Sequence, residues 1–232
     1  HVQGSSPEGR AARTEDDCYP PLSVAPLVEG EALLGLEYDM PVASAQVKSC
    51  LLLSGLYAGG PTILKEPVVS RDHTERMLVA LGVPLQTVGP MVAFDPDNPE
   101  WKGGWDPFDW EVPGDLSSAA FLLAGALMVP GSDVVVRGVG TNPTRTGLLD
   151  VVRLMGAGAQ AVPIEEGAGG EPRADLHVAH TQPKGVALGG QLPVRIIDEV
   201  TALCAVGASP AGTTSSRDPP HFRDTAPPPV SA

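Results

Sequence analysis

Two short segments of this sequence carry side chains that can bind an anion at the start of a helix. In Ser44-Ala45-Gln46, the Ser44 hydroxyl can cap a helix or bond a ligand, and the Gln46 amide can both donate and accept. In Ser70-Arg71, the guanidinium offers a planar pair of donors to an oxyanion. Because the free N–H groups and the positive dipole end of a helix N-terminus also attract anions, both segments are candidate anion sites, with simple capping as the alternative.

A carboxylate stands at the start of a third expected helix. Asp198 can accept a proton from a ligand hydroxyl in a transfer reaction, or it can be the N-cap of that helix. Glu199 is the weaker candidate, with a structural role. His177 and His180 lie three positions apart in an expected strand, so their side chains point to opposite faces. No further ligand is suitably spaced, and we expect no metal site.

The elements that must position these residues form a repeated pattern. Three stretches, 44–60, 117–131 and 198–212, each combine a helix of small residues with a glycine turn that leads into a β-prone segment. In the first two, a second helix follows at 70–82 and 144–156 and stops at a glycine. The order helix, strand, helix, strands is therefore written twice and begun a third time. This pattern predicts an α/β (α+β) fold built from repeats.

The charge balance limits the classes of partner. The 232 residues contain 15 Lys and Arg against 28 Asp and Glu, a formal net charge of −13, which repels nucleic acid and acidic membrane surfaces. An anionic ligand must therefore be captured by a local group of donors. We expect no nucleic acid and no membrane as partners.

The cysteines indicate a reducing compartment. Cys18, Cys50 and Cys204 form no CxxC pair, and the last two lie in apolar runs, where we expect them to pack in the core. No run of apolar residues has the length of a membrane span, and no secretory signal pattern opens the chain. These features favour the cytoplasm.

Three tryptophans crowd a segment rich in Pro, Gly and Asp between the first two repeats. Trp101, Trp105 and Trp110 either stack on a ligand or cover a sheet edge beside a crossing between domains, and the second interpretation is favoured.

Several long segments resemble the family of 5-enolpyruvylshikimate-3-phosphate synthases. They are PVASAQVKSCLLLSGLYAGGPTILKEPVVSRDHTERML, VPGDLSSAAFLLAGALMVPGSDVVVRGVGTNPTRTGLLDVVRLMGA and RIIDEVTALCAVGASPAGTT. The resemblance runs from about Tyr19 to Thr214, with the segments in the family's order and spacing. It implies two domains of βαβαββ units joined by a double crossover, incomplete in this chain.

The same resemblance implies a division of the chain. Residues 1–18 are a disordered or extended segment, and 19–112 are part of the shikimate-phosphate-binding domain. Residues 113–214 are part of the second domain, and 215–232 are a Pro-rich tail that departs from the family.

The reaction implied is transfer of the enolpyruvyl group of phosphoenolpyruvate to the 5-hydroxyl of shikimate 3-phosphate, with no cofactor. By similarity, Ser44, Ala45 and Gln46 match a substrate-binding site, and Ser70 matches the position that binds the shikimate phosphate. Arg71 follows and can reach the same anion. Asp198 matches the residue proposed as proton acceptor. Family members are usually monomeric, cytoplasmic enzymes of aromatic amino acid biosynthesis.

The chain departs from the family in segments that supply cations to phosphoenolpyruvate. The family's Lys-Ser…Arg, Gly-Asn-Ala-Gly-Thr, Arg-Pro-Met and Lys-Glu-Ser-Asp-Arg segments are absent. Since such cations stabilise the transition state, we expect little or no turnover by this chain alone. The alternatives are a related transferase acting on UDP-N-acetylglucosamine, and a non-catalytic remnant or half-protein.

Overall fold

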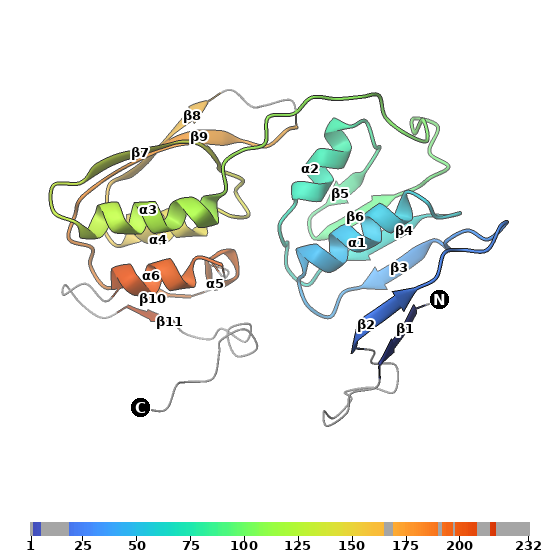
Figure 1. Cartoon of the computed structure of the whole chain (residues 1–232), viewed down its shortest axis with the longest axis horizontal. Coiled ribbons are helices and arrows are strands. Elements are labelled where there is room, and N and C mark those ends of the chain that lie inside the picture. Colours follow the sequence, from blue (N-terminus) through green and yellow to red (C-terminus); the bar gives the residue numbers. More distant parts are fainter. Residues whose placement is uncertain are drawn as a thin grey trace.

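The computed structural model describes residues 2–5, 19–164, 169–189, 192–196, 198–207 and 214–216. Most of the elements form two halves that lie side by side along the long axis of the molecule (Figure 1). The chain passes from the first half to the second through the segment that follows Phe94 and leads to Leu116.

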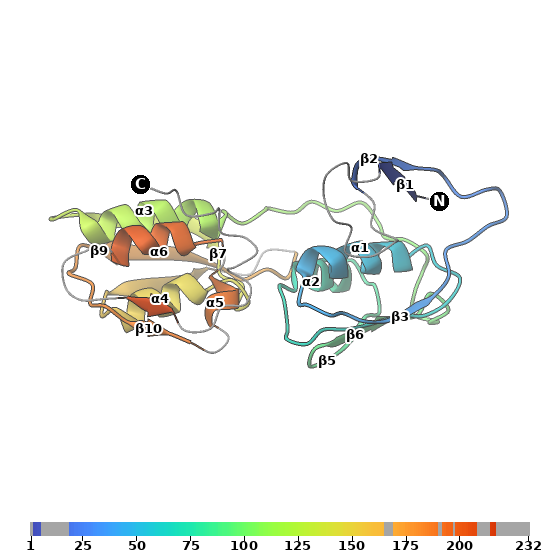
Figure 2. The same cartoon turned by 90° about the horizontal axis from the view of Figure 1, so that it is seen from below.

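The first half is a single βαβαββ unit. Helices α1 and α2 cover one face of a sheet with the strand order β3-β4-β6-β5 (Figure 2). β3 and β4 are parallel, and the other neighbours are antiparallel. The elements are β3 (Leu36–Asp39), α1 (Ala45–Gly55), β4 (Thr62–Lys65), α2 (His73–Ala80), β5 (Gln86–Val88) and β6 (Met91–Phe94).

The second half repeats this order. Its first strand is reduced to a parallel bridge between Gly114 and Val139, and the antiparallel sheet order β7-β9-β8 corresponds to β4-β6-β5. The elements are α3 (Leu116–Met128), β7 (Asp133–Gly140), α4 (Gly147–Leu154), β8 (Ala159–Ile164) and β9 (Arg173–Ala179).

A third unit begins after β9. Strands β10 and β11 are parallel, and helices α5 and α6 lie between them in the sequence. Helix α6 packs against α3. The elements are β10 (Ala187–Leu188), α5 (Leu192–Arg195), α6 (Val200–Gly207) and β11 (Ser215–Ser216). The predicted pattern, written twice and begun a third time, is confirmed. So are the two helix stops, since Gly82 and Gly156 have φ values of 82° and 79°, in the left-handed region.

The prediction that two cysteines pack in the core is wrong. Cys50 and Cys204 are both exposed, and Cys18 lies outside the described residues. In α1 the buried positions are Lys48, Leu52 and Gly55, spaced by four and three residues, and Cys50 lies between them on another face. Apolar neighbours in the sequence therefore did not indicate which side of the helix faces the sheet.

Trp101 packs against the core of the first half. Its ring packs edge to face on Phe94, with centroids 5.7 Å apart, and Trp105 packs on Trp101. This packing fits the structural interpretation of the tryptophan segment.

The chain ends are described only in part. Val2–Ser5 forms β1, which pairs antiparallel with β2 (Tyr19–Val24). The other residues of the predicted N-terminal segment, and those beyond Ser216, lie outside the described residues. In the described part of the chain, no helix has the length and apolar character to cross a membrane.

Candidate functional site

All the candidate residues line one hollow of about 250 Å³. The first half contributes the start of α1 and the loop that precedes α2, and the second half contributes Asp198, in the turn that leads into α6. The candidates are Ser44, Ala45, Gln46, Ser70, Arg71 and Asp198. The two helix starts that were predicted as anion sites therefore converge, and α5 lies at the edge of the second half that faces α1 (Figure 1).

The start of α1 has the predicted capping geometry. Ser44 is extended (φ −145°, ψ 106°), and its Oγ accepts a hydrogen bond of 3.3 Å from the backbone N–H of Val47. Ala45 and Gln46 form the first helical residues and line the hollow. The cap fixes the direction of α1, so that its N-terminal turn lines the hollow.

Ser70 is a buried polar residue in the wall of the hollow. It is 8% exposed, and its hydroxyl oxygen has no hydrogen-bond partner within the part of the chain that the structure describes. Since a buried hydroxyl normally has a partner, this oxygen is suited to bond a ligand.

Arg71 and Asp198 join the two halves. The Arg71 guanidinium donates to the Asp198 carboxylate, and Arg145 lies 3.8 Å from the same carboxylate. The Asp198 side chain is 43% exposed and pairs with these cations, two residues before α6 begins. Glu199 is buried and accepts from the Ser117 hydroxyl, which fits its structural interpretation.

Asp72 stands at the N-cap position of α2, but its side chain makes no capping hydrogen bond. Its carboxylate accepts hydrogen bonds from Arg76 Nε (3.0 Å) and from Asn142 Nδ2 of the second half (2.7 Å). Burial acts to raise the pKa of Asp72, but the bonds from Arg76 and Asn142 outweigh it and hold the pKa below its ordinary value. The Asp72 carboxylate therefore links the two halves, and it does not bond the N–H groups at the start of α2.

Sequence reasoning missed two polar residues that line the same hollow, Thr144 and Arg195. Arg195 donates to the Pro143 carbonyl oxygen at 2.7 and 3.1 Å. Gly147 allows this approach, because a Cβ there would lie 2.7 Å from Ile196 Cγ2 and 2.8 Å from Arg195 Cβ. The Asn-Pro-Thr-Arg-Thr-Gly segment stood out in the sequence as part of the family resemblance. Nothing in the sequence indicated that Arg195 packs against this segment.

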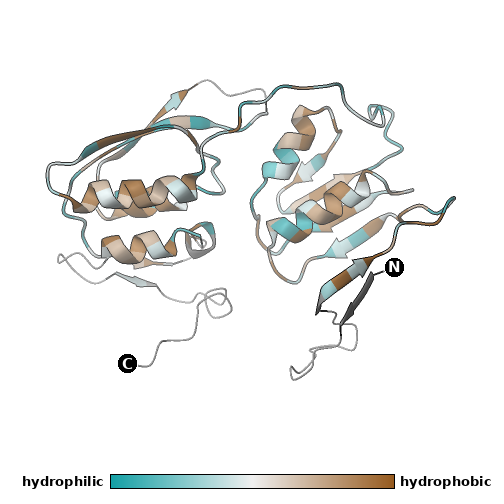
Figure 3. Cartoon of the chain, viewed as in Figure 1, coloured by the Kyte–Doolittle hydropathy of each residue, from teal (hydrophilic) through white to brown (hydrophobic). Residues whose placement is uncertain are grey.

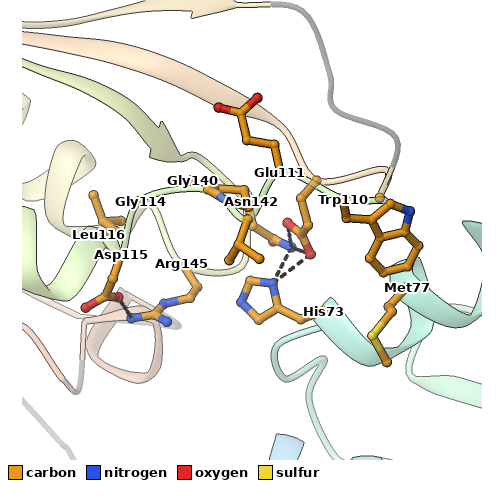
Figure 4. Close-up of a pocket in the computed structure, with 14 residues that line it drawn as sticks. His73, Met77, Trp110, Glu111, Gly114, Asp115, Leu116, Gly140, Asn142 and Arg145 are labelled. Carbon is orange, nitrogen blue, oxygen red and sulfur yellow. Dashed lines mark hydrogen bonds and ion pairs between the residues drawn. The ribbon is translucent and has the colours of Figure 1, made fainter. Parts of the chain in front are cut away.

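A larger hollow of about 360 Å³ lies beside the crossing between the halves (Figure 4). Its polar groups bond to one another: His73 Nδ1 lies 2.7 Å from Glu171 Oε1, and Asn142 Nδ2 donates to Glu171 Oε2 at 3.2 Å. Trp110 lines this hollow, where its ring could stack on a ligand. None of the candidate residues lies in it.

The two strand histidines have separate partners. His177 pairs with Asp133, and His180 Nδ1 lies 2.8 Å from the Leu127 carbonyl oxygen. Across the described ranges, no three His, Cys, Asp or Glu side chains are grouped to hold a metal ion.

Comparison with known proteins identifies the family. The chain matches the model of the EPSP synthase (3-phosphoshikimate 1-carboxyvinyltransferase) family over residues 9–226. It is 46% identical over 202 residues to the 3-phosphoshikimate 1-carboxyvinyltransferase of Geobacter sp. (strain M21), and 48% identical to that of Geobacter sulfurreducens. Each match covers 86% of this chain and 45% of the relative.

The structural comparison agrees. The fold matches EPSP synthase from Acinetobacter baumannii with a TM-score of 0.77 and 37% identity, over 97% of this chain and 47% of that one. The chain thus spans a little under half the length of the relatives it matches. The sequence match over most of its length and the shared fold together show that the chain belongs to the EPSP synthase family.

Proposed function

We propose that this chain carries the shikimate 3-phosphate site of an enzyme that transfers the enolpyruvyl group of phosphoenolpyruvate to the 5-hydroxyl of shikimate 3-phosphate. The observation that carries the proposal is the convergence of α1, the Ser70-Arg71 loop and Asp198 on one hollow. In this proposal, residues 19–112 belong to the shikimate-phosphate-binding domain and 113–214 to the second domain.

Each residue has a chemical role in the proposal. The Ser70 hydroxyl, which has no partner among the described residues, and the Arg71 guanidinium bind the ring phosphate. Ser44 and Gln46 hydrogen-bond the bound substrate. The phosphate competes with Asp198 for Arg71, so ligand binding loosens the ion pair between them. Asp198 then takes the 5-hydroxyl proton as the oxygen adds to C2 of phosphoenolpyruvate and the methylene carbon C3 gains a proton. Loss of a proton from C3 restores the double bond as the bond between C2 and the phosphate oxygen breaks, and inorganic phosphate is released.

Titration calorimetry tests the binding step. The chain should bind shikimate 3-phosphate saturably, and Gln46→Ala or Arg71→Ala should weaken the affinity by about tenfold or more, the loss of one charge-assisted contact. Arg153→Ala is the matched control, because Arg153 lies on α4, half exposed and outside the hollow. Absence of binding by a folded chain would overturn the proposal, and tighter binding of a UDP-amino sugar would reassign it to the related transferase.

Turnover by the chain alone should be low. The described cations at the hollow are Arg71 and Arg195, and both already bond to protein groups. Phosphoenolpyruvate brings a phosphate and a carboxylate that need further cations. Phosphate release from the chain mixed with both substrates should stay near background, and a rate above about 1 per second would contradict this expectation.

The proposed setting is the cytoplasm, with the two phosphorylated compounds as the only partners of a monomeric protein. The charge balance supports the choice of partners, since a formal charge of −13 disfavours nucleic acid and acidic membrane surfaces.

A further inference from the structure

Lys48 is a fully buried cation in the first half. Its side chain is 1% exposed, and its Nζ lies 2.7 Å from Glu66 Oε1 and 2.6 Å from Glu75 Oε1. Both carboxylates are also buried. One ammonium group thus joins two carboxylates from different elements, where apolar side chains would ordinarily fill the space.

This ion network connects the two parts of the hollow that come from the first half. Lys48 lies on α1, two residues after Gln46, and Glu66 follows β4 at the start of the loop that leads to Ser70. The same oxygen, Glu66 Oε1, also accepts a long hydrogen bond of 3.4 Å from the backbone N–H of Ser70. A chain of two contacts therefore runs from Lys48 on α1, through the Glu66 carboxylate, to the backbone of Ser70.

The loop borders empty space on its other side. A second hollow of about 320 Å³ lies behind it, lined by Lys48, Glu66 and Glu75, and Val69 lines both this hollow and the candidate site. The loop thus forms a wall between two hollows. Because packing fixes a segment only where atoms fill the space beside it, the ion network supplies contacts that help to hold this wall in place.

We propose that Lys48 and Glu66 are positioning residues that set the place of Ser70 and Arg71 relative to the start of α1, and so determine selectivity for a phosphorylated ring over the same ring without phosphate. This proposal rests on the proposed function for its ligand. Its structural part, that Glu66 fixes the loop, stands independently of any ligand.

The test compares two carboxylates that share one lysine. Glu66→Ala removes the contact to Ser70 and leaves the Lys48–Glu75 pair, while Glu75→Ala leaves the Lys48–Glu66–Ser70 connection. Neither change leaves Lys48 without a carboxylate, so both variants should fold. Glu66→Gln retains an oxygen that can accept from Lys48 and Ser70, and serves as the conservative rescue.

Calorimetry with shikimate 3-phosphate and with shikimate measures the selectivity. Glu66→Ala should weaken binding of the phosphorylated compound by about tenfold and that of shikimate by less than about twofold, because only the phosphate depends on the loop. Glu75→Ala and Glu66→Gln should stay within about threefold of the wild type for both. An equal loss for both compounds in Glu66→Ala would overturn the proposed selectivity.

Amide hydrogen exchange of the ligand-free chain gives a second readout. In Glu66→Ala the Ser70 amide should exchange about tenfold faster or more, with no such change in Glu75→Ala or in the second half. Unchanged exchange at Ser70 would overturn the positioning role. If the wild-type chain binds neither compound, the proposed function fails, and the exchange rates still decide whether Glu66 fixes the loop.

Discussion

Among the residues that the structure describes, the core of the second half contains 23 buried hydrophobic residues, and the corresponding cluster in the first half contains six. Both halves follow one order of elements, so the difference lies in the side chains. Helices α3 and α6 are mostly hydrophobic, whereas α1 and α2 carry hydrophilic turns (Figure 3). The first half buries Lys48, Glu66 and Glu75 in addition to its small apolar cluster.

This difference matches the roles proposed for the halves. The first half carries the two helix starts that face the hollow, and ion pairs hold them together. The second half carries Asp198 beside a large aliphatic core. Electrostatic changes should therefore act mainly on the first half and changes in apolar volume mainly on the second.

Lys48→Met should have the largest effect on the stability of the chain. It removes the only cation that the structure shows between Glu66 and Glu75 and leaves both carboxylates buried, which should cost about 3–5 kcal/mol of unfolding free energy. Urea unfolding followed by tryptophan fluorescence measures it, because Trp101 packs against the core of the first half. A loss below about 1 kcal/mol would show that the charges do not hold this half.

Leu123→Ala tests the opposite half. Leu123 is 2% exposed on α3, and its truncation should cost about 2–5 kcal/mol through lost burial and a residual cavity. Amide hydrogen exchange should become faster mainly in α3, β7 and α6, and should change little in α1 and α2. Equal loosening of both halves would remove the contrast between them.

Gly147→Ala should have a moderate effect, because its Cβ would lie within 3 Å of Ile196 and Arg195. The neighbours must move to make room for this Cβ, which should lower the free energy of unfolding by about 1–3 kcal/mol and displace Arg195 from the hollow. Gly158→Ala is the control, since that Cβ would meet no atom within 4 Å. The two variants would unfold at the same urea concentration if the close approach were unimportant.

Protonation of Asp72 at low pH should weaken the link between the halves. We expect this to be the smallest of the four effects on stability. Because the pKa of Asp72 is lowered in the folded chain, its contribution to stability is present above its ordinary pKa of about 3.9 and is lost as the pH falls through the lowered value. Asp72→Asn should flatten this part of the dependence of unfolding free energy on pH. Identical pH profiles for both proteins would contradict the assignment.

The sequence was sufficient to predict the repeated unit, because small-residue helices and glycine stops are local signals. It also singled out the residues that converge on the hollow. It did not reveal Lys48, which stands alone in an apolar helical run and has its partner Glu66 18 positions away. Pairing at that separation depends on which faces of α1 and α2 meet the sheet, and that is decided by packing. The same reason explains why Cys50 was wrongly placed in the core.

Arg195 shows the same limit. Its contact with Pro143 joins residues 52 positions apart. The chain segments come this close because position 147 is a glycine, which has no Cβ. The motif containing Gly147 was visible, but its partner was not.

Backbone amide NMR during a titration with shikimate 3-phosphate tests the central claim most directly. The account predicts that the amide signals of Ser44 to Gln46, Ser70, Arg71 and Asp198 shift together along one saturation curve, since one ligand contacts both halves. Shifts confined to one half, or centred on the hollow lined by Trp110, would contradict it.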